Sequence, residues 1–129
     1  MRKKKLRHLG SLGLAIVIAT GYSEVWTIDE IPFVPTPIEV VDRMLEMAEV
    51  KKGDIVYDLG SGDGRIVIRA AKKYGARGVG IEADPELIEL SRKKAREEGV
   101  SHLVEFQAED ALKVDVSPAT VVTLYMLPW

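Results

Sequence analysis

One short segment constrains the fold of this chain more than any other, because an apolar run ends there in an acid and then turns through alternating glycines. It reads Val-Tyr-Asp-Leu-Gly-Ser-Gly-Asp-Gly-Arg from Val56 to Arg65, with the glycines at Gly60, Gly62 and Gly64. A residue without Cβ can take positive φ and lets a ligand lie against the backbone. The Ile-Val-Ile-Arg-Ala-Ala run that follows favours a helix. The segment therefore predicts a strand, a ligand-binding turn and a helix.

The charge around this turn indicates which kind of ligand it would hold. A dinucleotide fingerprint spaces its glycines as G-x-G-x-x-G and receives a pyrophosphate, whereas this chain has G-x-G-x-G with Asp58 before it and Asp63 within it. Two carboxylates would repel a phosphate. They suit a cationic ligand such as S-adenosylmethionine, which carries an ammonium group, a sulfonium centre and no phosphate. The alternative is a glycine-rich turn whose acids face solvent.

The seven residues from Asp58 to Gly64 resemble the first motif of the class I S-adenosylmethionine-dependent methyltransferases. This resemblance implies S-adenosyl-L-methionine as the cofactor. The residues that it assigns to cofactor binding in this motif are Asp58, Gly60, Ser61, Gly62, Asp63 and Gly64.

Strand and helix patterns alternate along the rest of the chain. A proline-containing arm over 24–35 precedes Thr36-Pro37-Ile38-Glu39, which has the form of a capping box and predicts a helix through about Val50. Its core-facing positions are expected to be Ile38, Val41, Met44, Leu45 and Ala48. Strands are predicted over 54–59, 78–81, 103–107 and 119–125, and helices over 65–74 and 85–98. This alternation predicts an α/β fold with a doubly wound, mainly parallel Rossmann-like sheet in the order 3-2-1-4, flanked by helices.

The predicted sheet is incomplete for the class that the motif resembles. Members of that class usually carry three more strands after the fourth, whereas this chain stops at Trp129. We therefore interpret residues 36–129 as a methyltransferase domain truncated at its C-terminus. A fourth strand without a neighbour would leave an unpaired edge that favours aggregation unless another segment covers it.

The first 23 residues have the layout of a signal or a short membrane anchor. A basic cluster is followed by an uncharged stretch over 9–23. As a helix this stretch would reach roughly 22 Å, short of the ~30 Å hydrocarbon core. The two alternatives are membrane association through 9–23 and packing of the segment on the domain. Because the cofactor must be present, the expected location is the cytoplasm or a membrane face in the compartment that contains it.

Charge and composition exclude several other functions. Five of the 18 basic residues lie in the N-terminal cluster, so 13 remain in the rest of the chain against 20 acidic residues. Such a domain has no general attraction for nucleic acid, and a basic protein substrate fits better. The chain has no cysteine and two histidines, His8 and His102, so we expect no metal site and no thiol chemistry.

Two further acids complete the expected cofactor site. Glu82 follows the second strand, 22 residues after Gly60, where a carboxylate can accept hydrogen bonds from two ribose hydroxyls. Its neighbour Ala83 is expected to lie beside the adenine. Asp110, after the third strand, resembles the aspartate that takes the adenine amino group in this class, and the backbone of Ala111 would serve a ring nitrogen. Asp110 could instead cap the local turn.

The end of the fourth strand separates subfamilies of this class. Leu-Tyr-Met-Leu-Pro at 124–128, together with the prolines around Phe33, is similar to a family of protein-lysine methyltransferases that includes archaeal broad-specificity enzymes and the mitochondrial enzymes that modify the c-type ring protein of ATP synthase. The resemblance implies a protein substrate with an accessible lysine, and Tyr125 and Phe33 as candidate catalytic residues beside the methyl group. The alternatives are methyl transfer to a small molecule or RNA, and a non-catalytic remnant that binds S-adenosylmethionine.

Overall fold

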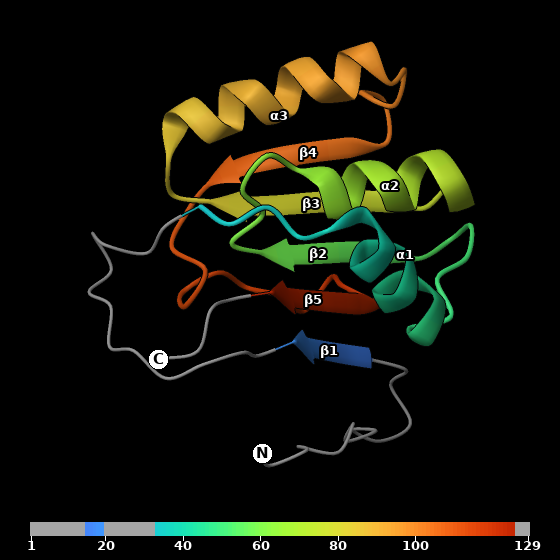
Figure 1. The fold of residues 1–129 in the computed structure, drawn as a ribbon. Coiled ribbons are helices and arrows are strands. Elements are labelled where there is room, and N and C mark those ends of the chain that lie inside the picture. The colour runs from blue at the N-terminus through green and yellow to red at the C-terminus, as the bar shows by residue number, and fades with distance from the viewer. Residues whose placement is uncertain (1–14, 20–32, 126–129) are drawn as a thin grey trace.

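Five parallel strands form one sheet in the computed structural model, which describes residues 15–19 and 33–125 (Figure 1). Their order across the sheet is β1-β5-β2-β3-β4. The strands span Ala15–Ala19 (β1), Ile55–Leu59 (β2), Arg77–Glu82 (β3), Val104–Ala108 (β4) and Val121–Tyr125 (β5). The four predicted strands are β2, β3, β4 and β5, and their predicted order 3-2-1-4 is confirmed.

Strand β2 lies in the centre of the sheet, between β3 and β5, as its apolar sequence predicts. Val56 is fully buried, and Tyr57 and Asp58 are buried beside it. In the parallel register Asp58 lies opposite Gly80 of β3 on one side and Thr123 of β5 on the other. An acid at this position is therefore enclosed by two neighbouring strands.

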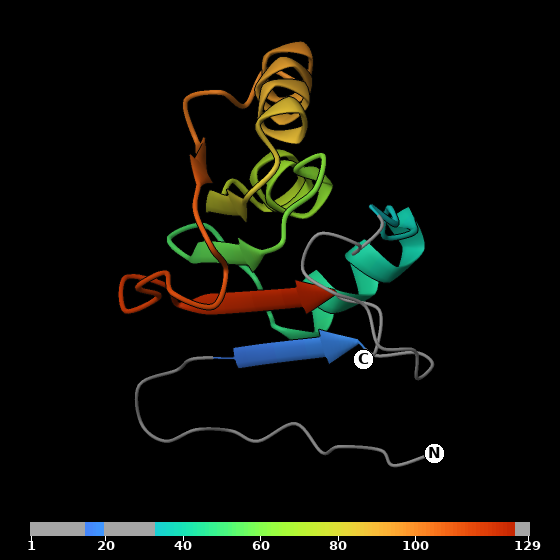
Figure 2. The same cartoon turned by 90° about the vertical axis from the view of Figure 1, so that its left-hand side faces the viewer.

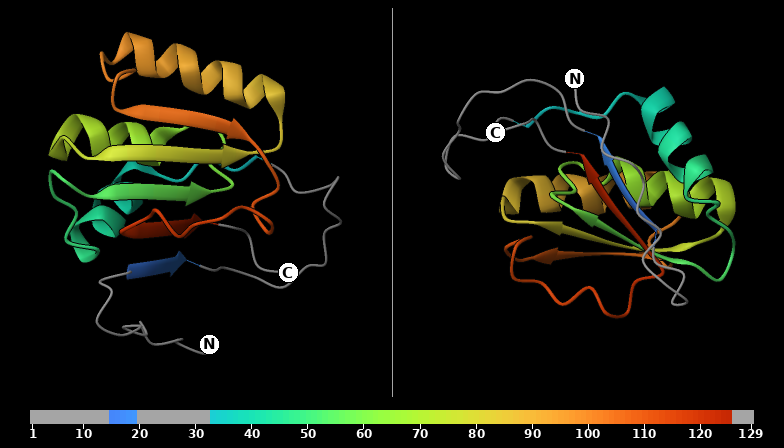
Figure 3. Two further views of the ribbon diagram at one scale, coloured as in Figure 1. Left: turned by 180° about the vertical axis from the view of Figure 1, so that it is seen from behind. Right: turned by 90° about the horizontal axis from the view of Figure 1, so that it is seen from below.

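Three helices cover one face of this sheet, and the connection over 109–120 runs across the other face (Figures 2 and 3). They are α1 (Ile38–Met47), α2 (Arg65–Tyr74) and α3 (Pro85–Glu97). Helix α2 packs on β2 and β3 through a buried apolar stripe that includes Ile66 and Val67, and it ends at Gly75 with φ 68°. The bounds of α2 match the sequence prediction to the residue.

The start of α1 differs from the prediction. The helix begins at Ile38 after Pro37, and no side chain caps it, so the expected capping box with Thr36 as the cap is wrong. Thr36 is instead buried, and its carbonyl oxygen accepts a hydrogen bond from Arg65. Ile38 is 44% exposed rather than in the core, because the helix begins one residue later than the capping box implies and its buried positions are Val41, Met44 and Leu45.

Part of the N-terminal segment over 9–23 is strand β1. Ala15–Ala19 pairs in parallel with Val121–Tyr125, so the predicted unpaired edge beside β5 is covered by the chain itself. Of the two alternatives for this segment, the structure gives packing on the domain. No helix within 15–19 and 33–125 is long and apolar enough to span a membrane. Residues 9–14, 20–23 and most of the predicted arm over 24–35 lie outside the described residues.

Candidate functional site

The candidate site lies where the chain order across the sheet reverses. From β2 the chain moves to β3 and β4 on one side, and then returns to β5 on the other side of β2. In open α/β sheets ligands bind outside the carboxyl ends of the strands at this switch point. The glycine turn follows β2, Glu82 ends β3 and Tyr125 ends β5, so the topology brings all three to one edge of the sheet.

The glycine turn has the conformation that its sequence predicts. Gly60, Gly62 and Gly64 all have positive φ, at 73°, 53° and 78°. The amides of Gly60 and Ser61 both donate to the carbonyl of Ile81 at 2.9 Å, which fastens the turn to the end of β3. Side chains with a Cβ would strain all three glycine positions, so these glycines are a requirement of the backbone path.

Two side chains pack directly on this turn. A Cβ added at Gly62 would overlap with ring carbons of Phe33, whose side chain is 45% exposed. Phe33, a candidate from the sequence, therefore lies over the turn. Ser61 is buried in the other direction, and its hydroxyl would lie 2.7 Å from a Cβ at Gly80. The Ser61 side chain thus faces β3, which leaves its backbone as the part that a ligand could contact.

Glu82 faces the glycine turn as predicted. Its Oε2 accepts a hydrogen bond from the amide of Gly62 at 2.9 Å, and its Oε1 accepts one from the amide of Asp84 at 3.0 Å. Each carboxylate oxygen has a further lone pair, so Glu82 can still accept hydrogen bonds from a diol. Asp84 in turn accepts from the Glu86 amide at 2.9 Å and caps α3 before Pro85. Its neighbour Ala83 is exposed at the same edge.

Asp58 is 2% exposed and lies beneath the turn. Thr123 Oγ1 donates a hydrogen bond to Asp58 Oδ1 at 2.7 Å. Burial raises the pKa of Asp58 to about 7, against the hydrogen bond from Thr123, and the negative charges of Glu82 and Asp63 add to this rise. The three acids are thus close enough to interact, and Asp58 changes its charge near neutral pH.

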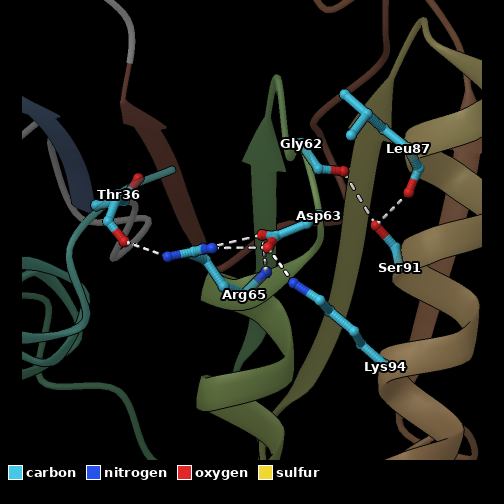
Figure 4. A network of polar contacts seen from close by, with 7 residues as sticks. All are labelled: Thr36, Gly62, Asp63, Arg65, Leu87, Ser91 and Lys94. Carbon is cyan, nitrogen blue, oxygen red and sulfur yellow. Dashed lines mark hydrogen bonds and ion pairs between the residues drawn. The ribbon is translucent and has the colours of Figure 1, made fainter. Parts of the chain in front are cut away.

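Asp63 has its charge balanced within the protein (Figure 4). The guanidinium of Arg65 donates to both of its oxygens, at 2.9 and 2.7 Å, and the ammonium of Lys94 contacts it from α3. Burial favours a higher pKa, but these hydrogen bonds and charges outweigh it and lower the pKa of Asp63 to about 2. The expectation that Asp63 offers an unbalanced negative charge to a ligand is therefore wrong, because two cations compensate it.

The same network ties three parts of the chain to the turn (Figure 4). Arg65 also donates to the carbonyl of Thr36 at 2.9 Å, which fixes the segment that carries Phe33. The hydroxyl of Ser91 lies 3.0 Å from the carbonyl of Gly62 and so connects α3 to the turn. Sequence reasoning missed these residues and Thr123, since ordinary Lys, Ser and Thr residues carry no motif. Arg65, two residues after a buried acid, was the one local signal.

Asp110 and Tyr125 occupy less defined positions. Asp110 is exposed, and its carboxylate accepts from the amide of Leu112 at 2.9 Å and lies 3.7 Å from the Lys113 ammonium. It therefore caps the local turn, the alternative that its sequence position left open, while Ala111 beside it is partly exposed. Tyr125 is partly buried and packs against the hydrophobic core. Within the described ranges no group of His, Cys, Asp and Glu is arranged to hold a metal.

Fold and site together define a Rossmann-like domain of the methyltransferase class. A family model described as the ANTKMT methyltransferase domain matches residues 58–129, and the chain belongs to this family. A protein-lysine N-methyltransferase of Saccharolobus islandicus is 45% identical over 101 residues, which cover 78% of this chain and 63% of that protein. The human lysine N-methyltransferase that is named for the C-type ring protein of ATP synthase is 41% identical over 98 residues, which cover 76% of this chain and 41% of that protein.

Two solved structures extend this comparison. The first is described as an RNA methyltransferase from Salinibacter ruber in complex with S-adenosyl-L-homocysteine, and it matches with a TM-score of 0.72 and 65% identity over 74% of this chain and 62% of that one. An S-adenosylmethionine-dependent methyltransferase from Thiobacillus denitrificans, also with S-adenosyl-L-homocysteine, matches with a TM-score of 0.62 and 29% identity over 69% and 36%. The chain thus spans about two-fifths to two-thirds of the length of these relatives.

Proposed function

We propose that this chain binds S-adenosyl-L-methionine and belongs to a protein-lysine N-methyltransferase. The observation that carries the proposal is its identity of 41–45% with lysine methyltransferases of an archaeon and of human, over a stretch of the chain long enough to include most of the site. The domain would work in the compartment that supplies this cofactor, in the cytoplasm or at a membrane face.

The residues at the switch point fit this cofactor. Asp58 and Glu82 place two carboxylates beside the glycine turn, while Arg65 and Lys94, the cations nearest the turn, are both paired with Asp63. A pyrophosphate would meet no unpaired cation among these described residues, whereas a cationic nucleoside meets acids. We assign the ribose hydroxyls to Glu82, the ammonium group to Asp58 and the close approach of the nucleoside to the glycine backbone.

The adenine and the methyl acceptor are assigned to the ends of the neighbouring strands. Asp110 and the backbone of Ala111 would receive the adenine, beside Ala83. S-adenosylmethionine, when bound, supplies an electrophilic methyl group on its sulfonium. The aromatic faces of Phe33 and Tyr125 would flank the acceptor and, by excluding water, favour the neutral form of a lysine amine, which is the nucleophilic one.

RNA is the second candidate acceptor, because the Salinibacter structure with 65% identity is described as an RNA methyltransferase. The charges favour a protein. Apart from the N-terminal cluster the chain carries 13 basic and 20 acidic residues, and phosphate neutralisation needs an excess of basic side chains.

Two measurements test the proposal in sequence. Isothermal titration calorimetry of the full chain with S-adenosyl-L-homocysteine should show binding that is lost in Glu82→Gln, whereas Glu105→Gln on exposed strand β4 should bind like the original chain. Incubation with methyl-labelled S-adenosylmethionine, a cell extract and total RNA should then label protein, with methyl-lysine after hydrolysis. Label that is released by ribonuclease and not by protease would refute the lysine assignment. A chain that binds no S-adenosyl-L-homocysteine would refute the proposal as a whole.

A further inference from the structure

Strand β5 carries one buried hydroxyl that packing does not explain. Its residues Val121 and Val122 are buried apolar side chains, whereas Thr123 is a polar residue with 0% exposure. A valine has nearly the same shape, so a threonine in this position brings a hydroxyl group that must find a partner inside the protein. The partner that it finds is Asp58.

The register of the sheet creates this contact. Thr123 lies directly opposite Asp58 on the neighbouring strand β2, and Thr123 Oγ1 donates to Asp58 Oδ1 at 2.7 Å. The same hydroxyl lies 3.4 Å from the carbonyl of Tyr57, a longer contact, so its single proton is best used on the carboxyl group. The other oxygen, Asp58 Oδ2, accepts no hydrogen bond from the residues that the structure describes.

The surroundings of Asp58 make this hydrogen bond important. Glu82 from β3 and Asp63 from the glycine turn are the ionisable groups that act on Asp58, and both are acids. The two nearby cations, Arg65 and Lys94, are committed to Asp63. No described cation therefore pairs with the Asp58 carboxylate, and the Thr123 hydroxyl is the one described group that favours its charged form.

We propose that Thr123 is a positioning residue that fixes the Asp58 carboxylate through one oxygen and leaves the other oxygen for the ammonium group of the bound cofactor. This inference rests on the proposed function, since it deepens the assignment of Asp58. A cationic ligand would supply the positive charge that the protein leaves out, and Thr123 would keep the carboxyl group ready for it.

The test compares Thr123→Val, which removes the hydroxyl, with Thr123→Ser, which keeps it. Affinity for S-adenosyl-L-homocysteine is measured by calorimetry from pH 5.5 to 8. In the original chain we expect binding to strengthen up to about pH 7 and then level off, as Asp58 ionises. Thr123→Val should weaken binding at pH 7 by about 10- to 100-fold, the loss expected for a hydrogen bond to a charged group, and should move the midpoint to higher pH. Thr123→Ser should keep the original midpoint.

A second readout separates this inference from the proposed function. The ¹³C carboxyl shift of Asp58, assigned with Asp58→Asn, reports its titration in the full chain without any ligand. A higher midpoint in Thr123→Val supports the proposal, and an unchanged midpoint overturns it. If the original chain binds no S-adenosyl-L-homocysteine, the proposed function fails, while this titration still decides whether Thr123 sets the charge of Asp58. An Asp58 midpoint near 4 in the original chain would also overturn the inference.

Discussion

Replacing Asp58 by Asn should stabilise the fold at neutral and alkaline pH. Burial raises the pKa of Asp58 from 3.8 to about 7, so the folded chain holds a proton that the unfolded chain has already released. Between these two values the stability of the original chain falls as the pH rises, by about 1.36 kcal/mol per pH unit. The full difference corresponds to about 4 kcal/mol and is reached above pH 8. Asn carries no charge, so this loss disappears in the variant.

The assay is urea unfolding of both chains, followed by far-ultraviolet circular dichroism at pH 5 and pH 8. The advantage of Asp58→Asn should grow by about 2 to 3 kcal/mol between these pH values, given the pKa near 7. The growth is the prediction, since the cost of fitting an amide is the same at every pH. Asp110→Asn, at an exposed carboxylate on the same edge, is the control and should show no such trend. An advantage that stays flat from pH 5 to pH 8 would refute the reasoning.

Three further predictions concern the turn and the sheet edge. Gly62→Ala should lower the unfolding free energy by about 1 to 2 kcal/mol, because its φ of 53° disfavours a side chain and Phe33 occupies the space; a smaller loss in a Phe33→Ala background is the check, and equal losses would exclude the contact. Asp63→Asn should remove about 2 kcal/mol of stability at pH 7, since the pKa of Asp63 near 2 provides stability that is present above 3.8 and lost as the pH falls through 2; an unchanged acid-unfolding curve would contradict this. Removing residues 1–19 should expose the edge of β5 and cause concentration-dependent association in sedimentation velocity, whereas a monomer at all concentrations would show that β1 does not protect that edge.

Local sequence determined most of the framework. Residues 56–65 fixed a buried strand, a turn with three positive φ values and a helix, because the steric freedom of glycine and the spacing of apolar residues act within a few positions. The alternation of strands and helices was enough for the order of four strands, since right-handed crossovers leave few topologies. Glu82 faced the turn as predicted because the ends of parallel strands meet at one edge.

Tertiary structure decided the state of each charge in the site. The acids Asp58 and Asp63 look equivalent in the sequence, yet one is buried without a described cation and has a pKa near 7, while the other has two cations and a pKa near 2. The difference arises from Thr123 and Lys94, which lie 65 and 31 residues away and reach the turn through strand register and helix packing. The same is true of β1, because the pairing of an apolar segment with β5 is a contact between distant parts of the chain. Burial and partners govern the free energy of a charge, and both depend on the folded neighbourhood rather than on spacing along the chain.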